Sequence, residues 1–435
     1  MFNKATLLYA VTLAVSAAAI PTPTPVTPAP GAAIPLRRRG ALTTPEGVFD
    51  FDKAVAANVA TVNKHRQNLM NLKANKGIEA FPIGAAIKEL AALPVDVAER
   101  LKSSIKKRQE ESLTDEEDDT EWAGSISVGT PDQKFLIDFD TGSSDLWFPN
   151  AECSSSTCSP KSKYDADSSS TSDSKSGSFS IQYGDGSTVS GPVFTDTVTV
   201  AGITAKTQTF SAVTTLSSSF ADDPIDGILG MAYPSISNLN VDPFFVNANK
   251  AGSTGANQFG FYLASSGSEL YLGGTQSDKY SGDIEFNKID TSTGFWQTTG
   301  ASVLVGGKSV GDSFDAIIDS GTTLAYGPPD AVKALYDAIP GSSVYDQDQG
   351  LYSLPCDSPP EVSFKWGSSG KEWAISSHNI NLGTTSSGSS DCVGAIGGQD
   401  LGLGDGVWLL GDAFMKNVYT VFDFDQDAVG FAELA

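Results

Sequence analysis

Two similar passages, far apart in the chain, decide its fold. The first is Phe135-Leu136-Ile137-Asp138-Phe139-Asp140-Thr141-Gly142-Ser143-Ser144, and the second is Phe314-Asp315-Ala316-Ile317-Ile318-Asp319-Ser320-Gly321-Thr322-Thr323. Each passage is an apolar strand that ends in Asp and continues with Thr or Ser, then Gly, then a hydroxyl residue. Asp and Gly are common turn formers, so either passage alone would predict only a strand followed by a turn.

A second shared phrase follows each passage at nearly the same distance. The phrases are Asp226-Gly227-Ile228-Leu229-Gly230 and Trp408-Leu409-Leu410-Gly411. There are 90 positions from Asp140 to Gly230 and 92 from Asp319 to Gly411. We infer two lobes built on one plan that face each other across a central cleft. The two Asp-containing turns are expected to meet at the floor of that cleft.

The rest of the chain predicts a mostly β, bilobal fold. After Trp122, short alternating strands stand between turns rich in Gly, Ser and Asp, and helical patterning is confined to short pieces such as residues 329–338. Residues 48–108 read as helical instead, over 54–76 and again over 85–107. We expect an N-terminal lobe over residues 122–295 and a C-terminal lobe over 296–435, preceded by a partly helical segment.

The first 121 residues divide into three parts. Residues 1–19 are typical of a secretory signal peptide, with Lys4, an apolar run over 5–15 and alanines at 17–19. Residues 20–108 are expected to form a pro-segment that ends at Lys106-Lys107-Arg108, a basic site of the kind that processing proteases cut. A solvated helix end is the alternative interpretation of that site. Residues 109–121 form an acidic stretch for which we expect disorder.

No apolar run after the expected signal peptide approaches the length that a bilayer needs, so no membrane partner is expected.

The charge is divided unevenly along the chain. Up to Arg108 there are 15 Lys and Arg against 7 Asp and Glu, whereas the remainder has 13 against 45. The two parts therefore attract each other at neutral pH. The acidic remainder excludes nucleic acid as a partner, because phosphates would be repelled. It suits work at low pH, although solubility alone would also explain many of these charges.

Four cysteines in a chain with a secretory signal predict two disulfides. Three pairings are possible, and we favour Cys153–Cys158 with Cys356–Cys392 because the other two would tie distant parts of the chain together. No cysteine then remains for a metal, and His378 is the only histidine after residue 108. These counts disfavour a zinc site and a histidine-based triad, and no cofactor or metal is expected.

Two carboxyl groups at one cleft floor indicate a specific chemistry. Carboxyl groups a few ångströms apart share one proton, so the ionised one can take a proton from a water while the protonated one donates to a peptide carbonyl. The Gly after each Asp lets backbone N–H groups approach the carboxylates. The hydroxyls of Thr141 and Ser320 are expected to brace the opposite turn. We therefore predict peptide-bond hydrolysis at Asp140 and Asp319.

These residues resemble the pepsin-like aspartic endopeptidases, particularly the secreted fungal type. The resemblance covers about residues 122–435. It is carried by Phe139-Asp140-Thr141-Gly142-Ser143-Ser144-Asp145-Leu146-Trp147, by Tyr183-Gly184-Asp185-Gly186-Ser187, and by the stretches 226–234, 317–328 and 408–432, in the order of the family.

The resemblance implies a role for each matching residue. Asp140 and Asp319 would be the catalytic pair, supported by Thr141, Gly142, Ser143, Ser320, Gly321 and Thr322. Tyr183 would lie on a hairpin flap with Gly184 and Asp185 and hydrogen-bond toward Trp147; taken alone, that stretch reads as a hairpin turn with a packed aromatic. Asp138, Phe220 and Tyr326 are expected beside the substrate. We also expect Asp185 to let Lys, as well as large apolar residues, precede the scissile bond.

The same resemblance implies the partners. They are polypeptide substrates, pepstatin-type inhibitors and the chain's own pro-segment, which would block the cleft with a lysine at the catalytic pair. Lys73 and Lys76 are our candidates for that lysine. We expect a monomer that is secreted to the extracellular space, with the vacuole as the alternative.

Two other functions compete with this prediction. A glycosidase also uses two carboxylates, but near-identical hydroxyl-rich turns suit a symmetric pair that shares a proton better than separated acid and base roles. A catalytically silent binding protein of the same fold would be expected to lack one Asp or Tyr183, and all three residues are present.

Overall fold

The computed structural model describes residues 31–39, 42–110, 121–182, 188–221, 223–264, 266–357, 359–368 and 370–435. The expected signal peptide and the expected flap tip at 183–187 lie outside these residues. Residues 109 and 110 belong to a helix and Glu121 begins a strand. The ends of the expected acidic stretch are therefore structured, and its remaining residues, 111–120, lie outside the described part.

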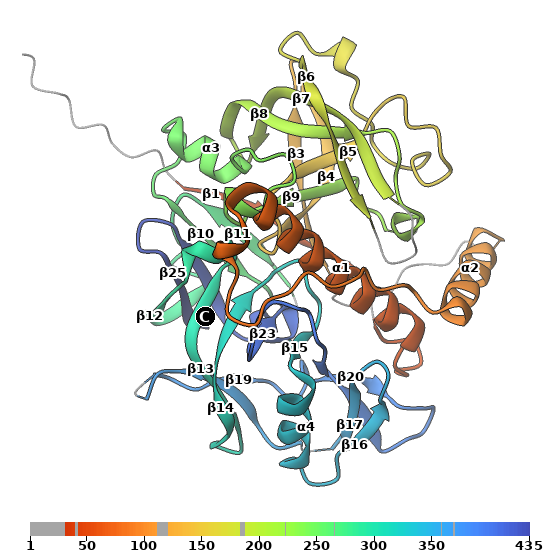
Figure 1. Cartoon of the computed structure of the whole chain (residues 1–435), viewed down its shortest axis with the longest axis vertical. Helices are drawn as coiled ribbons and strands as arrows, with labels where there is room; N and C mark the ends of the chain where they lie inside the picture. The colour runs from red at the N-terminus through yellow and green to blue at the C-terminus, as the bar shows by residue number, and fades with distance from the viewer. Residues whose placement is uncertain are drawn as a thin grey trace, which may run out of the picture.

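Three large sheets form a mostly β body with two lobes (Figure 1). The sheet of the first lobe runs in the order β2 (Arg37–Arg39), β3 (Glu121–Val128), β4 (Gln133–Asp140), β9 (Gly227–Gly230), β5 (Leu146–Pro149), β8 (Ile203–Val213), β7 (Thr188–Val200), β6 (Asp173–Gln182). The sheet of the second lobe runs in the order β19 (Trp373–Ile375), β18 (Val362–Trp366), β13 (Gln297–Val305), β14 (Lys308–Ile318), β23 (Val407–Leu410), β15 (Ala325–Gly327), β22 (Ile396–Gly398).

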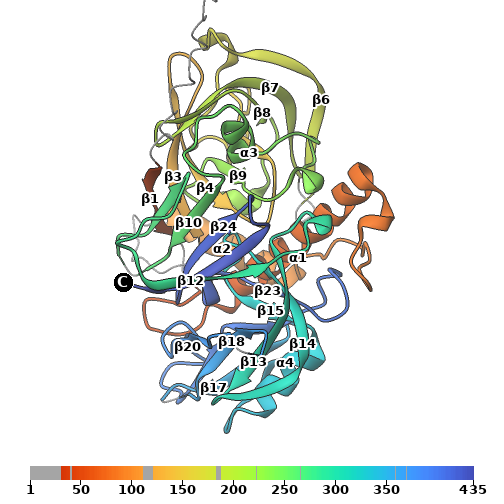
Figure 2. The same ribbon diagram turned by 90° about the vertical axis from the view of Figure 1, so that its left-hand side faces the viewer.

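A third sheet joins the two halves of the chain. Its order is β1 (Ala32–Pro35), β11 (Glu269–Leu272), β10 (Gln258–Tyr262), β24 (Tyr419–Asp423), β25 (Ala428–Leu434), β12 (Tyr280–Lys288). Figure 2 shows the blue C-terminal strands of this sheet beside green strands from the middle of the chain. A four-stranded sheet of β16 (Ser343–Asp346), β17 (Leu351–Pro355), β21 (Asp391–Gly394) and β20 (Asn381–Thr384) completes the second lobe.

The internal duplication seen in the sequence recurs in the strand register. β4 pairs in parallel with β9, which sets Asp140 opposite Gly230. β14 pairs in parallel with β23, which sets Ile318 opposite Leu410. In each lobe the next strand, β5 or β15, then pairs antiparallel to the partner strand. This arrangement confirms the predicted mostly β fold with two lobes built on one plan.

The longest helix, α1 (Phe51–Lys76), crosses the face of the molecule between the two lobes (Figure 1). It begins where the Asp50 side chain accepts a hydrogen bond from the backbone N–H of Lys53 at 3.1 Å. It ends at Gly77, whose φ of 89° favours glycine. Among the described helices, none combines the length and the apolar content that a bilayer crossing needs.

The second predicted helix is shorter than expected. We predicted helix over residues 85–107, but α2 spans Val95–Glu110. Proline lacks the backbone N–H and disfavours helical conformation in the residue before it, so Pro94 fixes the start of the helix. Residues 82–94 form an irregular link instead.

The other helical segments are short: η1 (Ile78–Ala80), η2 (Ala166–Ser168), η3 (Ser218–Phe220), η4 (Pro234–Ile236), α3 (Phe244–Lys250), η5 (Thr291–Thr293), α4 (Pro329–Asp337) and α5 (Asp412–Met415).

The core that holds the central sheet is rich in aromatic rings. Trp296 is fully buried, and its ring lies 5.1 Å from Phe422 and 4.7 Å from Phe424, centroid to centroid. Its indole N–H donates to the Met231 carbonyl at 3.1 Å, which ties this cluster to the segment after β9. The core therefore continues directly beneath the turns that carry the two acids.

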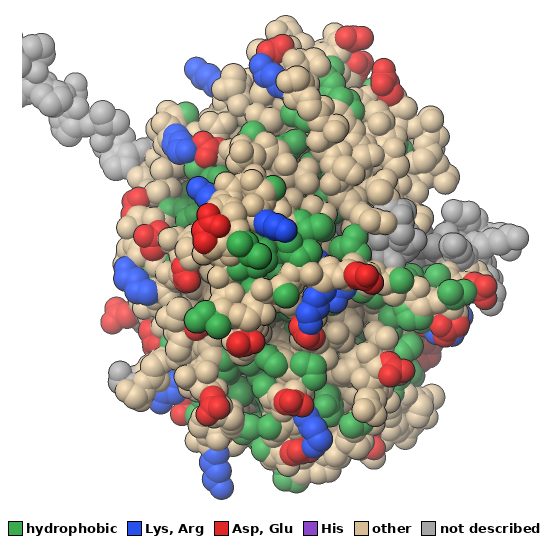
Figure 3. Space-filling view, in the orientation of Figure 1, with side chains coloured by type: hydrophobic (Ala, Val, Ile, Leu, Met, Phe, Trp, Pro, Cys, Tyr) green, Lys and Arg blue, Asp and Glu red, His purple; other side chains and the backbone are tan. Residues whose placement is uncertain are grey.

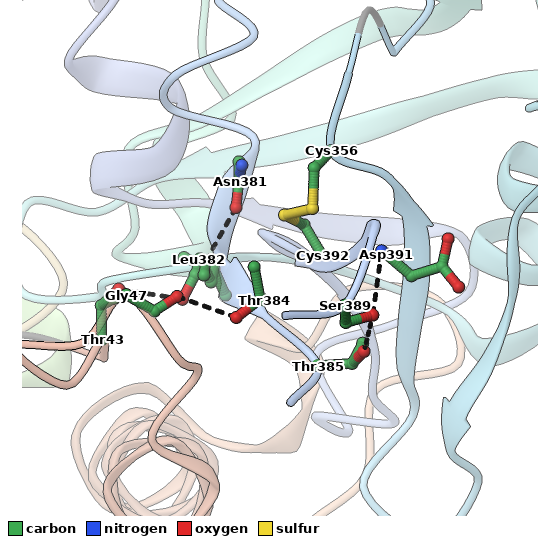
Figure 4. Close-up of a disulfide and its surroundings, with 11 residues drawn as sticks. Thr43, Gly47, Cys356, Asn381, Leu382, Thr384, Thr385, Ser389, Asp391 and Cys392 are labelled. Atoms are coloured by element: carbon green, nitrogen blue, oxygen red, sulfur yellow. Dashed lines mark hydrogen bonds between the residues drawn. A yellow bond between two sulfur atoms is a disulfide. The ribbon is translucent and has the colours of Figure 1, made fainter. Parts of the chain in front are cut away.

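Both disulfides have the predicted pairing, Cys153–Cys158 and Cys356–Cys392. Figure 4 shows that the second one lies near the turn that carries Thr43 and Gly47. The Thr43 hydroxyl donates to the Leu382 carbonyl at 2.9 Å, and the Thr384 hydroxyl donates to the Gly47 carbonyl at 3.1 Å. The N-terminal segment is thus bound to the four-stranded sheet of the second lobe shortly before α1 begins.

Candidate active site

Asp140 and Asp319 lie at equivalent ends of two parallel strand pairs and face each other. Asp140 is the last residue of β4, Asp319 directly follows β14, and the two are 1% and 0% exposed. A Cβ atom on Gly142 would overlap the carboxyl group of Asp319, and one on Gly321 would overlap that of Asp140. Only glycine therefore lets the two turns come this close.

Each carboxylate accepts a hydrogen bond from the backbone of its own turn. The N–H of Gly142 donates to Asp140 Oδ1 at 2.9 Å, and the N–H of Gly321 donates to Asp319 Oδ1 at 2.9 Å. The two bonds are equivalent because the two turns have the same sequence pattern. They orient both carboxyl groups toward the same space.

Two hydroxyl residues lock the turns to each other. The N–H of Thr141 donates to Ser320 Oγ at 3.0 Å, and the N–H of Ser320 donates to Thr141 Oγ1 at 2.9 Å. Each hydroxyl in turn donates to a carbonyl of the opposite strand, Ile318 at 3.0 Å and Phe139 at 2.6 Å. The resulting set of four hydrogen bonds is buried and has local two-fold symmetry.

The hydroxyl residues that follow the two glycines, Ser143 and Thr322, differ in their burial. Thr322 Oγ1 donates to Asp319 Oδ2 at 2.7 Å. Ser143 hydrogen-bonds Asp140 and is only partly buried. The site is therefore symmetric at its centre and asymmetric at its rim.

A lysine of α1 lies between the two carboxylates. Lys64 Nζ is 3.0 Å from Asp140 Oδ1, 2.9 Å from Asp319 Oδ2 and 3.0 Å from the Gly321 carbonyl. Our candidates for this position, Lys73 and Lys76, are wrong: both lie exposed in the last turn of α1. The neighbouring His65 is fully buried, and its Nε2 lies 3.0 Å from Asp319 Oδ2.

Comparison with known sequences identifies the family that shares this arrangement. The family model described as "Eukaryotic aspartyl protease" matches residues 121–434. This chain belongs to the eukaryotic aspartyl protease family.

Relatives within the family are similar over most of their length. The "Aspartic protease" of Phaffia rhodozyma is 44% identical over 327 residues, which cover 74% of this chain and 78% of the relative. "Cathepsin D" of Bos taurus is 38% identical over 340 residues (73% and 85%), and "Pepsin A" of Sus scrofa is 37% identical over 324 residues (73% and 82%). The predicted resemblance is confirmed: this aspartyl protease is a pepsin-like peptide-bond hydrolase that acts on polypeptides.

Electrostatics distinguish the two acids of this aspartyl protease. Burial raises the pKa of Asp140 above its usual range, and the charge of Asp319 adds to burial while Lys64 opposes it. Burial also raises the pKa of Asp319, but the charge of Lys64 and the hydrogen bond from His65 outweigh it and hold the pKa well below the usual range. Burial lowers the pKa of Lys64, yet the two carboxylates raise it further, so the lysine stays charged.

Asparagines of α1 hydrogen-bond to backbone carbonyls in the segments that follow β4 and β9. The side-chain amide of Asn68 donates to the Gly142 carbonyl at 2.7 Å, and that of Asn71 donates to the Ile236 carbonyl at 3.0 Å. Asn75 reaches the carbonyls of Ser235 and Ser237 at 3.0 and 2.8 Å. Helix α1 therefore satisfies these backbone groups with side-chain amides, in addition to its ion pair.

The sequence carried a signal for these contacts that we did not use. Asparagine is a poor helix former, yet α1 contains five of them, spaced so that several share one face. The buried polar residues of the helix are Asn58, Thr61, Asn63, His65, Asn68 and Asn71. A polar stripe on a helix that must be buried indicates a surface that hydrogen-bonds to a partner.

A further buried acid lies behind the pair. Asp412 begins α5 and is 0% exposed, and its N–H donates to the Thr322 carbonyl at 2.8 Å. Burial, together with the charges of Asp138 and Asp319, raises its pKa well above the usual range, although Lys416 opposes this. The surroundings of Asp412 therefore favour the neutral form of its carboxyl, whereas those of Asp319 favour the ionised form.

The remaining predicted site residues have separate placements. Trp147 in β5 and Phe220 in η3 are packed edge to face, with ring centroids 5.2 Å apart. Asp138 is buried in β4, two residues before Asp140. Tyr326 is buried in β15 with its ring against Gly397. The flap residues Tyr183, Gly184 and Asp185 lie outside the described residues, between β6 and β7. Substrate-binding roles for all of these stay predictions.

The described residues contain no group of three or more His, Cys, Asp or Glu side chains arranged to hold a metal ion. The two acids of the site face a lysine, a histidine and hydroxyl groups.

Proposed function

We propose that this aspartyl protease is the zymogen of a secreted acid endopeptidase, in which Asp140 and Asp319 activate a water for attack on internal peptide bonds. The observation that supports this best is that a single cation contacts both carboxyl groups, with Lys64 Nζ within 3.0 Å of each. Two carboxyl groups that can share one ammonium group open onto the same small space. A water molecule has the same hydrogen-bonding reach as that ammonium group.

The proposed mechanism starts once Lys64 has left. The pair then shares one proton, because two adjacent carboxylates cannot both ionise cheaply. The ionised carboxyl takes a proton from the water, and the resulting hydroxyl bonds to the carbonyl carbon of the substrate. The protonated carboxyl donates to the carbonyl oxygen. The C–N bond then breaks as the nitrogen takes up the proton that came from the water, and one hydroxyl of the tetrahedral intermediate returns its proton to the other carboxyl, which restores the shared proton. No covalent enzyme intermediate is formed.

Residues 20–108 act in this proposal as an intramolecular inhibitor. Helix α1 fills the space that a substrate chain needs, and the ammonium group of Lys64 balances the negative charge of Asp140 and Asp319. The excess of basic residues before position 109 and of acidic residues after it favours this docking at neutral pH. Acidification weakens the docking because it protonates carboxylates of the body.

We further propose a secreted destination, on the basis of residues 1–19 and the two disulfides, with the vacuole as the alternative. The preference around the scissile bond is proposed to be apolar. Lys is also accepted there, because Asp185 supplies a negative charge near the substrate. Unchanged Lys cleavage by Asp185→Ala would contradict this last part.

Digestion of acid-denatured haemoglobin tests the proposed function. Wild-type protein should digest it at acidic pH and stop when pepstatin is added, and Asp140→Asn should lose about 100- to 10,000-fold in rate because one partner of the proton exchange is gone. Equal digestion by both proteins, insensitive to pepstatin, would overturn the assignment of the pair. Membership of the family already sets aside the glycosidase alternative. Activity in this assay would set aside the silent binding protein.

A further inference from the structure

The loop over residues 399–406 joins β22 to β23 and lies against the link between α1 and α2. Strand β23 begins at Val407 and pairs in parallel with β14 up to Leu410, the residue opposite Ile318. The three steps along β23, at about 3.3 Å each, set the end of the loop roughly 10 Å from the level of Asp319. A polypeptide bound at the catalytic pair can therefore reach this loop with a few further residues.

The link pairs with this loop through its backbone, in the manner of an added strand. The Ala86 N–H donates to the Gly402 carbonyl at 3.0 Å, and the Asp405 N–H donates to the Ile83 carbonyl at 2.9 Å. A Cβ atom on Gly402 would lie 2.6 Å from the Ala86 carbonyl oxygen, so glycine lets the two backbones approach. The loop thus offers one acceptor and one donor to a chain that passes in extended form, whatever the side chains of that chain.

An acid of the loop binds a basic side chain of the link. Asp400 Oδ1 accepts a hydrogen bond from the Gly402 N–H at 3.1 Å, and its Oδ2 forms an ion pair with the ammonium group of Lys88. The hydrogen bond from Lys88 lowers the pKa of Asp400, so the cation binds the ionised carboxylate. Figure 1 shows the link running back beside α1 toward α2, and Figure 3 shows basic and acidic side chains next to each other in this band between the lobes. Because the loop itself holds Oδ1, the carboxylate keeps its orientation when Lys88 leaves.

We propose that the loop over residues 399–406 is a secondary binding site for an extended, lysine-containing stretch of the polypeptide substrate. The inference rests on the proposed function, since the loop becomes free when the segment before residue 109 leaves. The substrate then takes the place of the link: its backbone forms the two hydrogen bonds with the loop, and its lysine forms the ion pair with Asp400. The site holds the chain at a distance from the bond that is cut.

A secondary site of this kind acts on binding rather than on the chemical step. The ion pair is the same before and during the reaction, so it lowers KM and leaves kcat unchanged. The side chain of Asp400 is 62% exposed, and exposed ion pairs change an equilibrium by about two- to fivefold. The effect also depends on position, because the carboxylate can be reached from one distance along the substrate. This position differs from the one beside the scissile bond, where Asp185 is proposed to act.

The test measures kcat and KM of the acid-activated wild type on a set of fluorogenic peptides. All peptides share one apolar pair at the scissile bond, and one Lys replaces Gln at a position about two to seven residues away, on either side. The assay runs at about pH 5, where an ordinary Asp is ionised. We expect KM to be about two- to fivefold lower for Lys at one position or at two neighbouring ones. An equal KM for all peptides would overturn the inference. So would an equal decrease at every position, since the net negative charge of the body alone would then explain it.

Matched variants show whether the loop causes the preference. Asp400→Asn should raise KM for the best Lys peptide to the value for the Gln peptide. Asp278→Asn removes the same charge from an exposed turn between β11 and β12 and should retain the preference for Lys. A preference that survives in both variants would contradict the role of Asp400. Failure of the wild type to digest haemoglobin would instead refute the proposed function, whereas digestion without any preference for Lys would refute the secondary site alone.

Discussion

The Nε2 atom of His65 lies 3.0 Å from the Oδ2 atom of Asp319, and both side chains are completely buried. Since the pKa of Asp319 is held well below its usual range, this carboxyl is ionised and Nε2 carries the proton that joins them. The other ring nitrogen, Nδ1, is buried with no hydrogen-bond partner among the described residues. The histidine therefore binds α1 to one member of the pair only.

His65→Phe should weaken the docking of α1. The aromatic ring would keep its contact with Phe295, now 5.6 Å between centroids, but the hydrogen bond to a charged group, worth about 1.5–3 kcal/mol, would be lost. We expect faster appearance of activity after a drop to mildly acidic pH, followed with a fluorogenic peptide. His378→Phe, which changes an exposed histidine of the body, is the control. Activation no faster than in this control would contradict the role of His65.

Lys64→Met should destabilise the folded chain more strongly than His65→Phe. Removal of one partner from a buried ion pair leaves the other charges uncompensated and costs about 3–5 kcal/mol. Thermal unfolding should show a lower Tm, and peptide cleavage should become detectable at neutral pH. Lys73→Met alters an exposed lysine of the same helix and should change neither property. The assignment of Lys64 would fail if the two variants behaved alike.

The free energy of unfolding should decrease as the pH is lowered, over a range that Asp319 sets. A carboxyl with a depressed folded-state pKa contributes stability that is present above its ordinary pKa and is lost as pH falls toward the folded value. Asp140, whose pKa is raised, contributes to the pH dependence of stability with the opposite sign. Denaturant unfolding of Asp140→Asn protein, which cannot digest itself, should therefore show decreasing stability below the ordinary Asp range. The double variant with Asp319→Asn should show a shallower decrease; identical slopes would contradict this prediction.

Ser320→Ala should impair catalysis and stability together. It removes the acceptor for the Thr141 N–H and the donor to the Phe139 carbonyl, which leaves two buried polar groups without partners, at about 1–3 kcal/mol each. We expect kcat to fall more than KM rises, because Asp140 and Asp319 lose their alignment while the subsites that bind the substrate stay unchanged. Ser320→Thr keeps the hydroxyl and should retain near-normal kcat. A normal kcat for Ser320→Ala would show that the second turn needs no bracing.

The sequence was sufficient to predict the fold class and the meeting of the two acids. The reason is physical: the duplicated strand-Asp-hydroxyl-Gly pattern encodes its own local geometry, and glycine at 142 and 321 is demanded by the approach of the opposite carboxyl. The disulfide pairing could also be predicted, because short separations favour local bridges.

The contacts of α1 could not be predicted in the same way. The choice among Lys64, Lys73 and Lys76 depends on the rotation and the translation of α1 in the cleft, and these are fixed by asparagine contacts with distant carbonyls. The start of α2 was misjudged because residues 85–93 contain few turn residues, although Pro94 keeps them out of the helix.

The hydrogen bonds that cross between Thr141 and Ser320 have a mechanical consequence. They join two buried turns beside the carboxyl groups, so a shift of one turn against the other would break hydrogen bonds in a buried place. The spacing between Asp140 and Asp319 is therefore fixed by contacts of the two turns themselves, in addition to the contacts that Lys64 makes.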